Sequence, residues 1–423
     1  MEEPPPPLDP PRLLQALFHR AVAVADPMRI VPAHLPPKPP GRVVVVGAGK
    51  ASARMAEAAE AAWGPCEGLV ITRYGYARPC RGIEIVEAAH PVPDQAGVAA
   101  TGRLLELLDG LGERDFVLAL ISGGASALLC APVQGVTLAQ KQAVNAALLA
   151  SGAAIGDMNA VRKQLSRVKG GQLAAAASPA RMLALMISDV PGDDPATIGS
   201  GPTVGDTGTP AAARAILERW GIAAPPSVET ALAGAGRTVR PGDPRLSNVE
   251  NRVVAAPSRS LSAAAELARG HGCEARILGD AIEGEARKVA AEQAAMALKL
   301  RAERGPGTPP LLLLSGGELT VTRRGDGIGG PNAEFCLALA LALGGAPGIH
   351  AIACDTDGVD GGAEVAGALI GPATLDRARQ AGLNPERALA ENDAHTFFAA
   401  IGAQVVTGPT MTNVNDFRAI LLP

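Results

Sequence analysis

The most constraining feature of this 423-residue chain is a run of four valines that leads directly into glycines. Val43–Val46 is followed by Gly47-Ala48-Gly49-Lys50, and then by an alanine-rich stretch that we expect to form a helix over 51–62. A continuous apolar run without alternation is typical of a strand covered on both faces. A strand, a glycine turn and a helix in this order predict a parallel α/β fold.

The same alternation recurs along the chain and predicts two domains. A first helix is expected over 11–25, after a flexible proline-rich leader at 1–10. Further strands of the first half are predicted at 69–72, 84–87, 116–121 and 182–187, and those of the second half at 252–256, 275–278, 311–314, 319–322, 350–353, 404–406 and 417–421. We interpret the Pro/Gly-rich stretch 221–246 as a loop that ends the first domain. The prediction is a doubly wound, mainly parallel, Rossmann-like domain over 1–245 and a smaller mixed α/β domain over 246–423.

Composition excludes several classes of function. A net charge of −4 and a pI of about 5.9 argue against nucleic acid as a partner, because such proteins carry a basic face. The six cysteines form no CxxC pair, so we expect neither a disulfide framework nor a structural zinc. The N-terminus lacks the pattern of a signal peptide, and no apolar run reaches the ~18 residues that span a bilayer. We expect a cytoplasmic protein without a membrane partner.

The first glycine turn is a candidate phosphate site. Gly47 and Gly49 would leave backbone N–H groups at the positive end of a helix dipole, which favours anions. Ser52 stands where a dinucleotide fingerprint has its third glycine, and the Walker A spacing is absent. Lys50 is one of only seven lysines beside thirty-one arginines, which suggests a selected point charge. An ordinary exposed lysine in a tight turn is the alternative.

Two further segments offer groups for anions. Ser122-Gly123-Gly124 and Ser126 follow a predicted strand, where glycine amides and hydroxyls can converge on phosphate, although a simple strand–helix turn also needs glycine. Arg162, Ser166 and Lys169 would share one face of a helix, with a solvated basic face as the alternative.

Aspartates and small polar residues complete the candidates. Asp189 ends a predicted strand, where open-sheet enzymes place their chemistry, and Asp357 and Asp360 follow another strand. These carboxylates suit Mg²⁺ or a substrate proton, but also turn-rich loops. Thr412, Asn413 and Asn415 suit neutral hydrogen bonds to substrate hydroxyls or an Asx-rich loop.

As an ordered set, these motifs resemble the glycerate 2-kinases whose C-terminal half is a MOFRL-type module. The resemblance covers Gly47 to Asp416 and includes N-x-V-R-K from Asn159, S-G-G-E from Ser315, G-G-x-N from Gly329 and T-D-G-x-D-G from Thr356. It implies ATP-dependent phosphorylation of D-glycerate at the 2-hydroxyl, with Mg²⁺ or another divalent cation, in a cleft between the domains. Many relatives have Arg where this chain has Pro331, so no cationic role is carried over to that position.

The resemblance also extends the set of candidate site residues. Lys50, Asp189 and Arg162 are the expected catalytic residues, and Asp189, Asp357 and Asp360 the expected metal ligands. Contacts to substrate or phosphate are expected from Gly47, Gly49, Ser122, Gly123, Gly124, Ser126, Lys169, Ser315, Gly316, Gly317, Glu318, Asn332, Glu334, Thr412, Asn413 and Asn415. Two alternatives stay open: an NAD(P)H-dependent hydroxypyruvate reductase and a non-catalytic sugar-phosphate sensor. The chain is expected to be a monomer or a homodimer.

Overall fold

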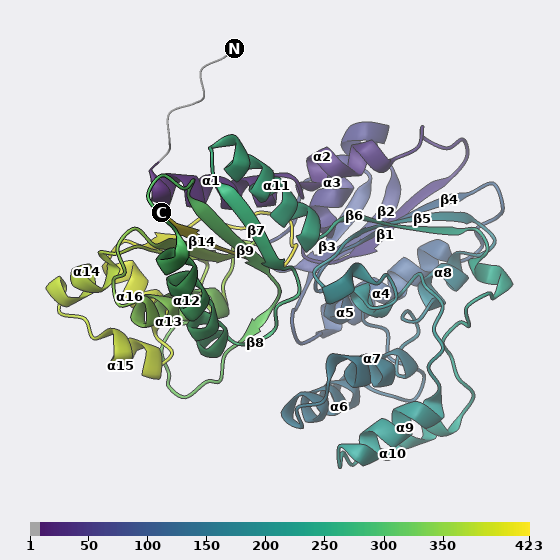
Figure 1. The fold of residues 1–423 in the computed structure, drawn as a ribbon. Coiled ribbons are helices and arrows are strands. Elements are labelled where there is room, and N and C mark those ends of the chain that lie inside the picture. Colours follow the sequence, from purple (N-terminus) through teal and green to yellow (C-terminus); the bar gives the residue numbers. More distant parts are fainter. Residues whose placement is uncertain (1–8) are drawn as a thin grey trace. The chain divides into compact units, whose positions relative to one another are not determined.

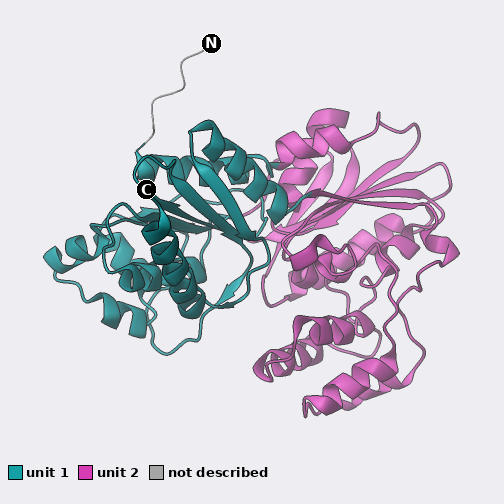
Figure 2. Ribbon diagram, in the orientation of Figure 1, with its two compact units in different colours: residues 1–26, 255–423 teal, residues 27–254 magenta. Residues whose placement is uncertain are grey.

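The computed structural model describes residues 9–423, which form two compact units (Figure 2). Unit 2 is the continuous segment 27–254, and unit 1 combines the segment that ends at Asp26 with 255–423. None of the helices described over 9–423 has both the length and the apolar character needed to cross a membrane.

Unit 2 is built on a six-stranded sheet with the order β3-β2-β1-β4-β5-β6. The strands are β1 (Val43–Ala48), β2 (Glu67–Arg73), β3 (Ile83–Ala88), β4 (Phe116–Ile121), β5 (Arg181–Ile187) and β6 (Val249–Ala255). The four neighbouring pairs from β3 to β5 are parallel. This order is that of the Rossmann-type doubly wound fold, which confirms the predicted fold class.

Helices cover both faces of this sheet, as the unbroken apolar strands require (Figure 1). One face carries α2 (Pro27–His34) and α3 (Ser52–Trp63), and the other carries α4 (Gln95–Leu108), α5 (Ala125–Leu128) and α8 (Gln172–Ala177). Strands β1 and β4 are buried along their whole length, because helices cover them on both sides.

Four helices of unit 2 form a separate small core. They are α6 (Leu138–Ala150), α7 (Ile155–Gln164), α9 (Pro210–Arg219) and α10 (Pro226–Ala233). The prediction of a loop over 221–246 was therefore wrong at α10. Its buried Val228 and Leu232 are spaced four residues apart, as on one helix face, but the flanking prolines and glycines hid that pattern.

Unit 1 contains a mixed sheet with the order β13-β12-β11-β14-β9-β7. Its strands are β7 (Glu274–Gly279), β9 (Leu311–Gly316), β11 (His350–Asp355), β12 (Gly367–Ile370), β13 (Gln404–Val405) and β14 (Asp416–Leu422). Only β7 and β9 pair in parallel, and the other neighbours are antiparallel. A separate pair joins β8 (Gly284–Glu285) to β10 (Leu319–Thr320). The predicted mixed α/β architecture is confirmed, although β8 and β12 were not foreseen.

Helices of unit 1 also lie in two layers (Figure 1). α1 (Pro10–Ala23) and α11 (Pro257–Gly270) share one core with the sheet. The opposite core includes α12 (Ala286–Glu303), α13 (Pro331–Leu343), α14 (Thr374–Gln380) and α16 (Ala394–Ala400), and α15 (Pro385–Ala390) packs beside it.

The units differ in two places from the domains expected at 1–245 and 246–423. Helix α1 belongs with the C-terminal residues: Ser260 Oγ donates to Ala21 O and Thr412 Oγ1 to Ala25 O, both at 2.8 Å. Strand β6, expected in the second domain, is the edge strand of the first sheet. Apolar patterning predicts that an element is buried, but not which sheet buries it.

The packing of α1 predicts a measurable contribution to stability. Leu14 is fully buried against unit 1, so Leu14→Ala should lower the free energy of unfolding by about 2–5 kcal/mol, as large-to-small core changes do. Chemical denaturation measures this loss, and Arg12→Ala, on the exposed side of the same helix, is the matched control. A loss for Leu14→Ala no larger than for the control would contradict the observed packing.

Candidate active site

Three chain segments predicted to carry chemistry follow neighbouring strands of unit 2. Lys50 follows β1, Gly123 and Gly124 follow β4, and Asp189 follows β5. Ala48 pairs with Ile121 and Ile121 with Met186, so the carboxyl ends of these strands lie side by side. The strand order reverses between β1 and β4, and open α/β sheets bind ligands outside the strand ends at such a point.

The first glycine turn does not hold its amides free for a ligand, contrary to the expectation for Gly47–Gly49. The N–H of Gly49 donates to Ile71 O (3.1 Å), that of Lys50 to Gly123 O (2.8 Å) and that of Ala51 to Ser122 Oγ (3.0 Å). A Cβ at Gly49 would lie 2.0 Å from Ser122 Oγ, and a Cβ at Gly47 2.3 Å from Leu120 O. These glycines therefore let β1 and its turn close on β4.

The second glycine turn is different. Ser122 is buried and its hydroxyl bonds to Ala51 N–H and Ser52 Oγ, so it supports the first turn from within. In the part of the chain from residue 9 onward, no acceptor takes the N–H of Gly123 or Gly124. The side chains of Lys50 and His90 flank Gly124, because a Cβ there would lie 3.3 Å from Lys50 Cγ and 3.0 Å from His90 Cδ2.

A pocket of about 550 Å³ opens beside Gly124 and is walled by α6, α7 and the loop of His90. Three cationic side chains line it: Lys141, Arg162 and Lys169. None of the described residues that line it is an aspartate or a glutamate. A pocket with this charge attracts an anionic ligand.

Arg162 and Lys169 reach this pocket by a different route from the one predicted. Helix α7 ends at Gln164, so the expected common helix face is wrong beyond that residue. Arg162 Nε donates to Asn145 Oδ1 (2.5 Å). Lys169 is fully buried, and its Nζ donates to Ser126 O (2.8 Å) and Gly199 O (3.4 Å), which ties it to the second glycine turn.

Lys141 was missed by the sequence reasoning. The rarity of lysine in this chain was the one available signal: of its seven lysines, Lys50 flanks Gly124, and Lys141 and Lys169 line the pocket beside it. Lys141 is 8% exposed, and its Nζ has no hydrogen-bond partner among the described residues.

Burial in the pocket disfavours the charged form of its two lysines. Burial lowers the pKa of Lys141, and nearby Arg162 lowers it further. Burial also holds the pKa of Lys169 well below its usual range, with Lys141 adding to the effect. An anion in the pocket would offset this cost, because it pairs the buried cations.

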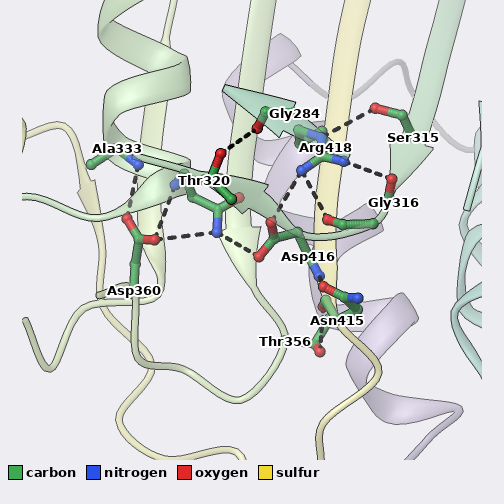
Figure 3. Close-up of polar contacts among 12 residues, drawn as sticks. Gly284, Ser315, Gly316, Thr320, Ala333, Thr356, Asp360, Asn415, Asp416 and Arg418 are labelled. Carbon is green, nitrogen blue, oxygen red and sulfur yellow. Dashed lines mark hydrogen bonds and ion pairs between the residues drawn. The ribbon is translucent and has the colours of Figure 1, made fainter. Parts of the chain in front are cut away.

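Unit 1 contains a second group of predicted residues in a buried polar network (Figure 3). The Asp360 carboxylate accepts N–H groups of Asn332 (3.0 Å) and Ala333 (2.8 Å), and so caps the N-terminus of α13. His395 Nε2 lies 3.1 Å from Asp360 Oδ2. Asn332 Nδ2 in turn donates to Asp416 Oδ1 (2.7 Å). Pro331 is the first residue of this helix, a position where proline is common.

The turn at Ser315, Gly316 and Gly317 is held by a residue that sequence reasoning did not select. Arg418 is fully buried, and its guanidinium donates to Gly316 O (2.6 Å), Gly317 O (3.1 Å) and Asp416 Oδ2 (3.1 Å) (Figure 3). Burial raises the pKa of Asp416 to about 7 against the opposing charge of Arg418, and burial lowers the pKa of Arg418. Arg418 therefore positions the glycine turn from inside the unit.

Several other predicted contacts are engaged within the protein. Glu334 accepts from Arg287 Nε (2.6 Å) and from Asn392 Nδ2 (2.9 Å). Asn413 Oδ1 accepts the N–H of Asn415, and Asn415 Oδ1 accepts that of Asp416, so both asparagines shape their own loop. Glu318, by contrast, is exposed.

Of the expected metal ligands, Asp189 lies in unit 2, and Asp357 and Asp360 lie in unit 1. Asp357 is buried, and its Oδ1 accepts the N–H of Val359 (2.8 Å). Within residues 9–423, no three His, Cys, Asp or Glu side chains gather as a metal cluster. The pocket of unit 2, with its cationic lining, is therefore a candidate anion site on an α/β fold.

Two family models match most of the described chain. The model "Domain of unknown function (DUF4147)" matches residues 13–233, and the model "MOFRL family" matches residues 311–416. A protein of Agrobacterium vitis named "Putative hydroxypyruvate reductase" is 52% identical over 97% of this chain and 94% of its own. The "D-glycerate 2-kinase" of Thermotoga maritima is 38% identical over 96% of each chain. A crystal structure of glycerate kinase from Thermotoga maritima has a TM-score of 0.87 and 37% identity, covering 97% of this chain and 99% of that one.

This chain belongs to the glycerate kinase family with a C-terminal MOFRL module. The resemblance read from the ordered motifs is thereby confirmed.

Proposed function

We propose that this protein transfers a phosphoryl group from ATP to the 2-hydroxyl of D-glycerate, giving 2-phosphoglycerate and ADP. The observation that supports this most directly is the cationic pocket beside Gly124, which is suited to an acid or a phosphate and lies where an open sheet binds ligands. Relatives that cover nearly the whole chain are named as kinases of glycerate.

Lys50 and the second glycine turn are proposed to act on the phosphoryl group. Phosphoryl transfer depends mainly on positioning and on neutralising charge at the transferred oxygens. The Lys50 side chain flanks Gly124, so its ammonium and the N–H groups of Gly123 and Gly124 would donate to those oxygens. The sequence pattern favoured the first glycine turn for this role. That turn would instead hold the backbone of Lys50 in place.

Arg162 and Lys169 are proposed to bind the acceptor. Both line the pocket, and their positions are set by Asn145 and by the carbonyls of Ser126 and Gly199. Side chains held this firmly lose little freedom when a ligand binds, which favours affinity and orientation.

Asp189 is proposed to orient the reacting hydroxyl, since it follows β5 at the same sheet edge as Lys50. Asp189 and Asp357 are carboxylates of the kind that hold Mg²⁺, which would neutralise nucleotide phosphate charge when bound. Mg²⁺ commonly uses one or two carboxylates together with substrate phosphates, so the lack of a cluster among residues 9–423 fits such a site. Asp360 is left out of this proposed metal site, because its carboxylate caps α13.

The alternative function is that of a hydroxypyruvate reductase, which is the name of the relative at 52% identity. The first glycine turn argues against this alternative. A dinucleotide pyrophosphate needs the amides that follow the first strand. Here the N–H groups of Gly49, Lys50 and Ala51 all donate within the protein, and Ser52 is fully buried.

Product analysis tests the proposal directly. With racemic glycerate, ATP and Mg²⁺, phosphorus NMR should show 2-phosphoglycerate and ADP appearing together, with half of the glycerate consumed if only the D form reacts. Parallel incubation with hydroxypyruvate and NADH should leave the NADH absorbance unchanged. Formation of 3-phosphoglycerate would overturn the regiochemistry, and NADH oxidation without ADP formation would support the reductase.

A further inference from the structure

We propose that Lys141 makes the enzyme selective for acceptors that carry a carboxylate, by donating from its ammonium group to that carboxylate inside the pocket of unit 2. This inference rests on the proposed function and adds a residue that determines which acceptors are used.

The first argument is that Lys141 is buried without a partner. Its side chain extends from α6 into the pocket lining, and its Nζ has no hydrogen-bond partner among residues 9–423. Buried ammonium groups are normally paired, because an unpaired charge loses its hydration without compensation. A buried cation that lines a pocket and lacks an internal partner indicates a ligand that supplies one.

The second argument is that the neighbouring groups are already engaged. Lys169 donates to two backbone carbonyls, and Arg162 donates to Asn145. No carboxylate belongs to the described pocket lining, so the protein there has no negative group for Lys141. Of the three cations, Lys141 is the one whose nitrogen is held by no hydrogen bond of the described chain.

The third argument concerns the kind of anion. The wall shared with Lys141 is formed largely by small or apolar side chains, including Ala127, Ala143, Ala146 and Leu149. Such a wall suits the carbon skeleton and single charge of a small acid, whereas a triphosphate presents charged oxygens along its length. A carboxylate beside the reacting hydroxyl would place Lys141 at the acceptor and leave the phosphoryl group to Lys50.

The first test is the stability of Lys141→Met without ligand. Methionine keeps the apolar stem and removes a desolvated charge that lies among like charges, so the melting temperature should equal or exceed that of the wild type. Lys299→Met removes the same charge from an exposed site and is the control. A clear fall in melting temperature for Lys141→Met alone would indicate a structural ammonium and overturn the inference.

The second test is binding of D-glycerate, followed as the rise in melting temperature at increasing concentration. The rise should occur in the wild type and in Lys299→Met and should be lost in Lys141→Met, beyond the effect of sodium chloride at equal ionic strength. Equal rises in all three proteins, or no rise in the wild type, would overturn the inference. This test needs no turnover, so it distinguishes failure of the carboxylate site from failure of the proposed kinase activity.

The third test is selectivity with ATP as donor. For Lys141→Met, kcat/KM for D-glycerate should fall about 10–100-fold, as expected for one lost charged hydrogen bond, whereas kcat/KM for glycerol should stay within about twofold. The KM for ATP should be unchanged. A loss confined to the KM for ATP would assign Lys141 to the nucleotide instead, and equal losses for glycerate and glycerol would also overturn the inference.

Discussion

Replacing Lys50 with methionine is expected to lower kcat about 10²–10³-fold, the cost typical of losing one preorganised charge that stabilises a transition state. Lys50 lies beside Gly124 at the edge where β1 and β4 end, and its backbone N–H bonds to Gly123 O independently of its side chain. The fold of the turn should therefore survive the substitution, and the melting temperature should change little. Steady-state kinetics and thermal denaturation of the same preparation measure both quantities.

Two further variants make this result interpretable. Lys38→Met removes an equal charge from an exposed site of the same unit and should keep near-normal activity. Lys50→Arg keeps the charge but changes its geometry, so only partial recovery is expected. Turnover of Lys50→Met within about threefold of the wild type would remove Lys50 from the mechanism, and a large drop in melting temperature would show that its role is structural.

Replacing Arg418 with methionine should lower the free energy of unfolding by about 3–5 kcal/mol, which is typical when one partner of a buried ion pair is removed. The guanidinium is the donor to Gly316 O and Gly317 O, and it pairs with Asp416. Without the guanidinium, these buried oxygens lose a hydrogen-bond donor, and the turn after β9 is less firmly held. Chemical denaturation followed by circular dichroism should show the loss.

The pair with Asp416 offers an internal check. Arg418→Met combined with Asp416→Asn should be less destabilised than Arg418→Met alone, because the second change removes the carboxylate that was left unpaired. The exposed Arg379→Met serves as the control for loss of an arginine charge. Additive effects of the two substitutions would show that Asp416 and Arg418 do not depend on each other.

The sequence predicted the central strands β1, β4 and β5 of unit 2 well because each contains a continuous apolar run. The order of the strands within the sheet could not be predicted in the same way. The sequence of β6 does not show which sheet it joins, and β6 is the edge strand of the first sheet. Helix α10 and strand β12 were missed because both are short, and α10 is flanked by prolines and glycines.

The candidate site was predictable where it depends on strand ends. Lys50, Gly124 and Asp189 each follow a recognisable strand, so their common edge follows from a parallel sheet. Lys141 could not be found, because its position in the pocket depends on how α6 packs on α7. The hydrogen bonds that occupy the amides of the first glycine turn also depend on tertiary contacts, here with β2 and β4.

The place of α1 has a consequence for how the chain is made. The apolar face of this helix is synthesised before any strand of unit 1, but it packs against β14, which lies between β11 and β9 and is the last of those strands to be made. All strands of the segment 27–254 have been synthesised once β6 is complete. The sheet of unit 1, in contrast, is incomplete until residues 416–422 have been synthesised. Leu14, Leu17 and Phe18 therefore lack this part of their packing from the synthesis of α1 until that of residues 416–422, and apolar side chains exposed in this way make a folding intermediate prone to aggregation.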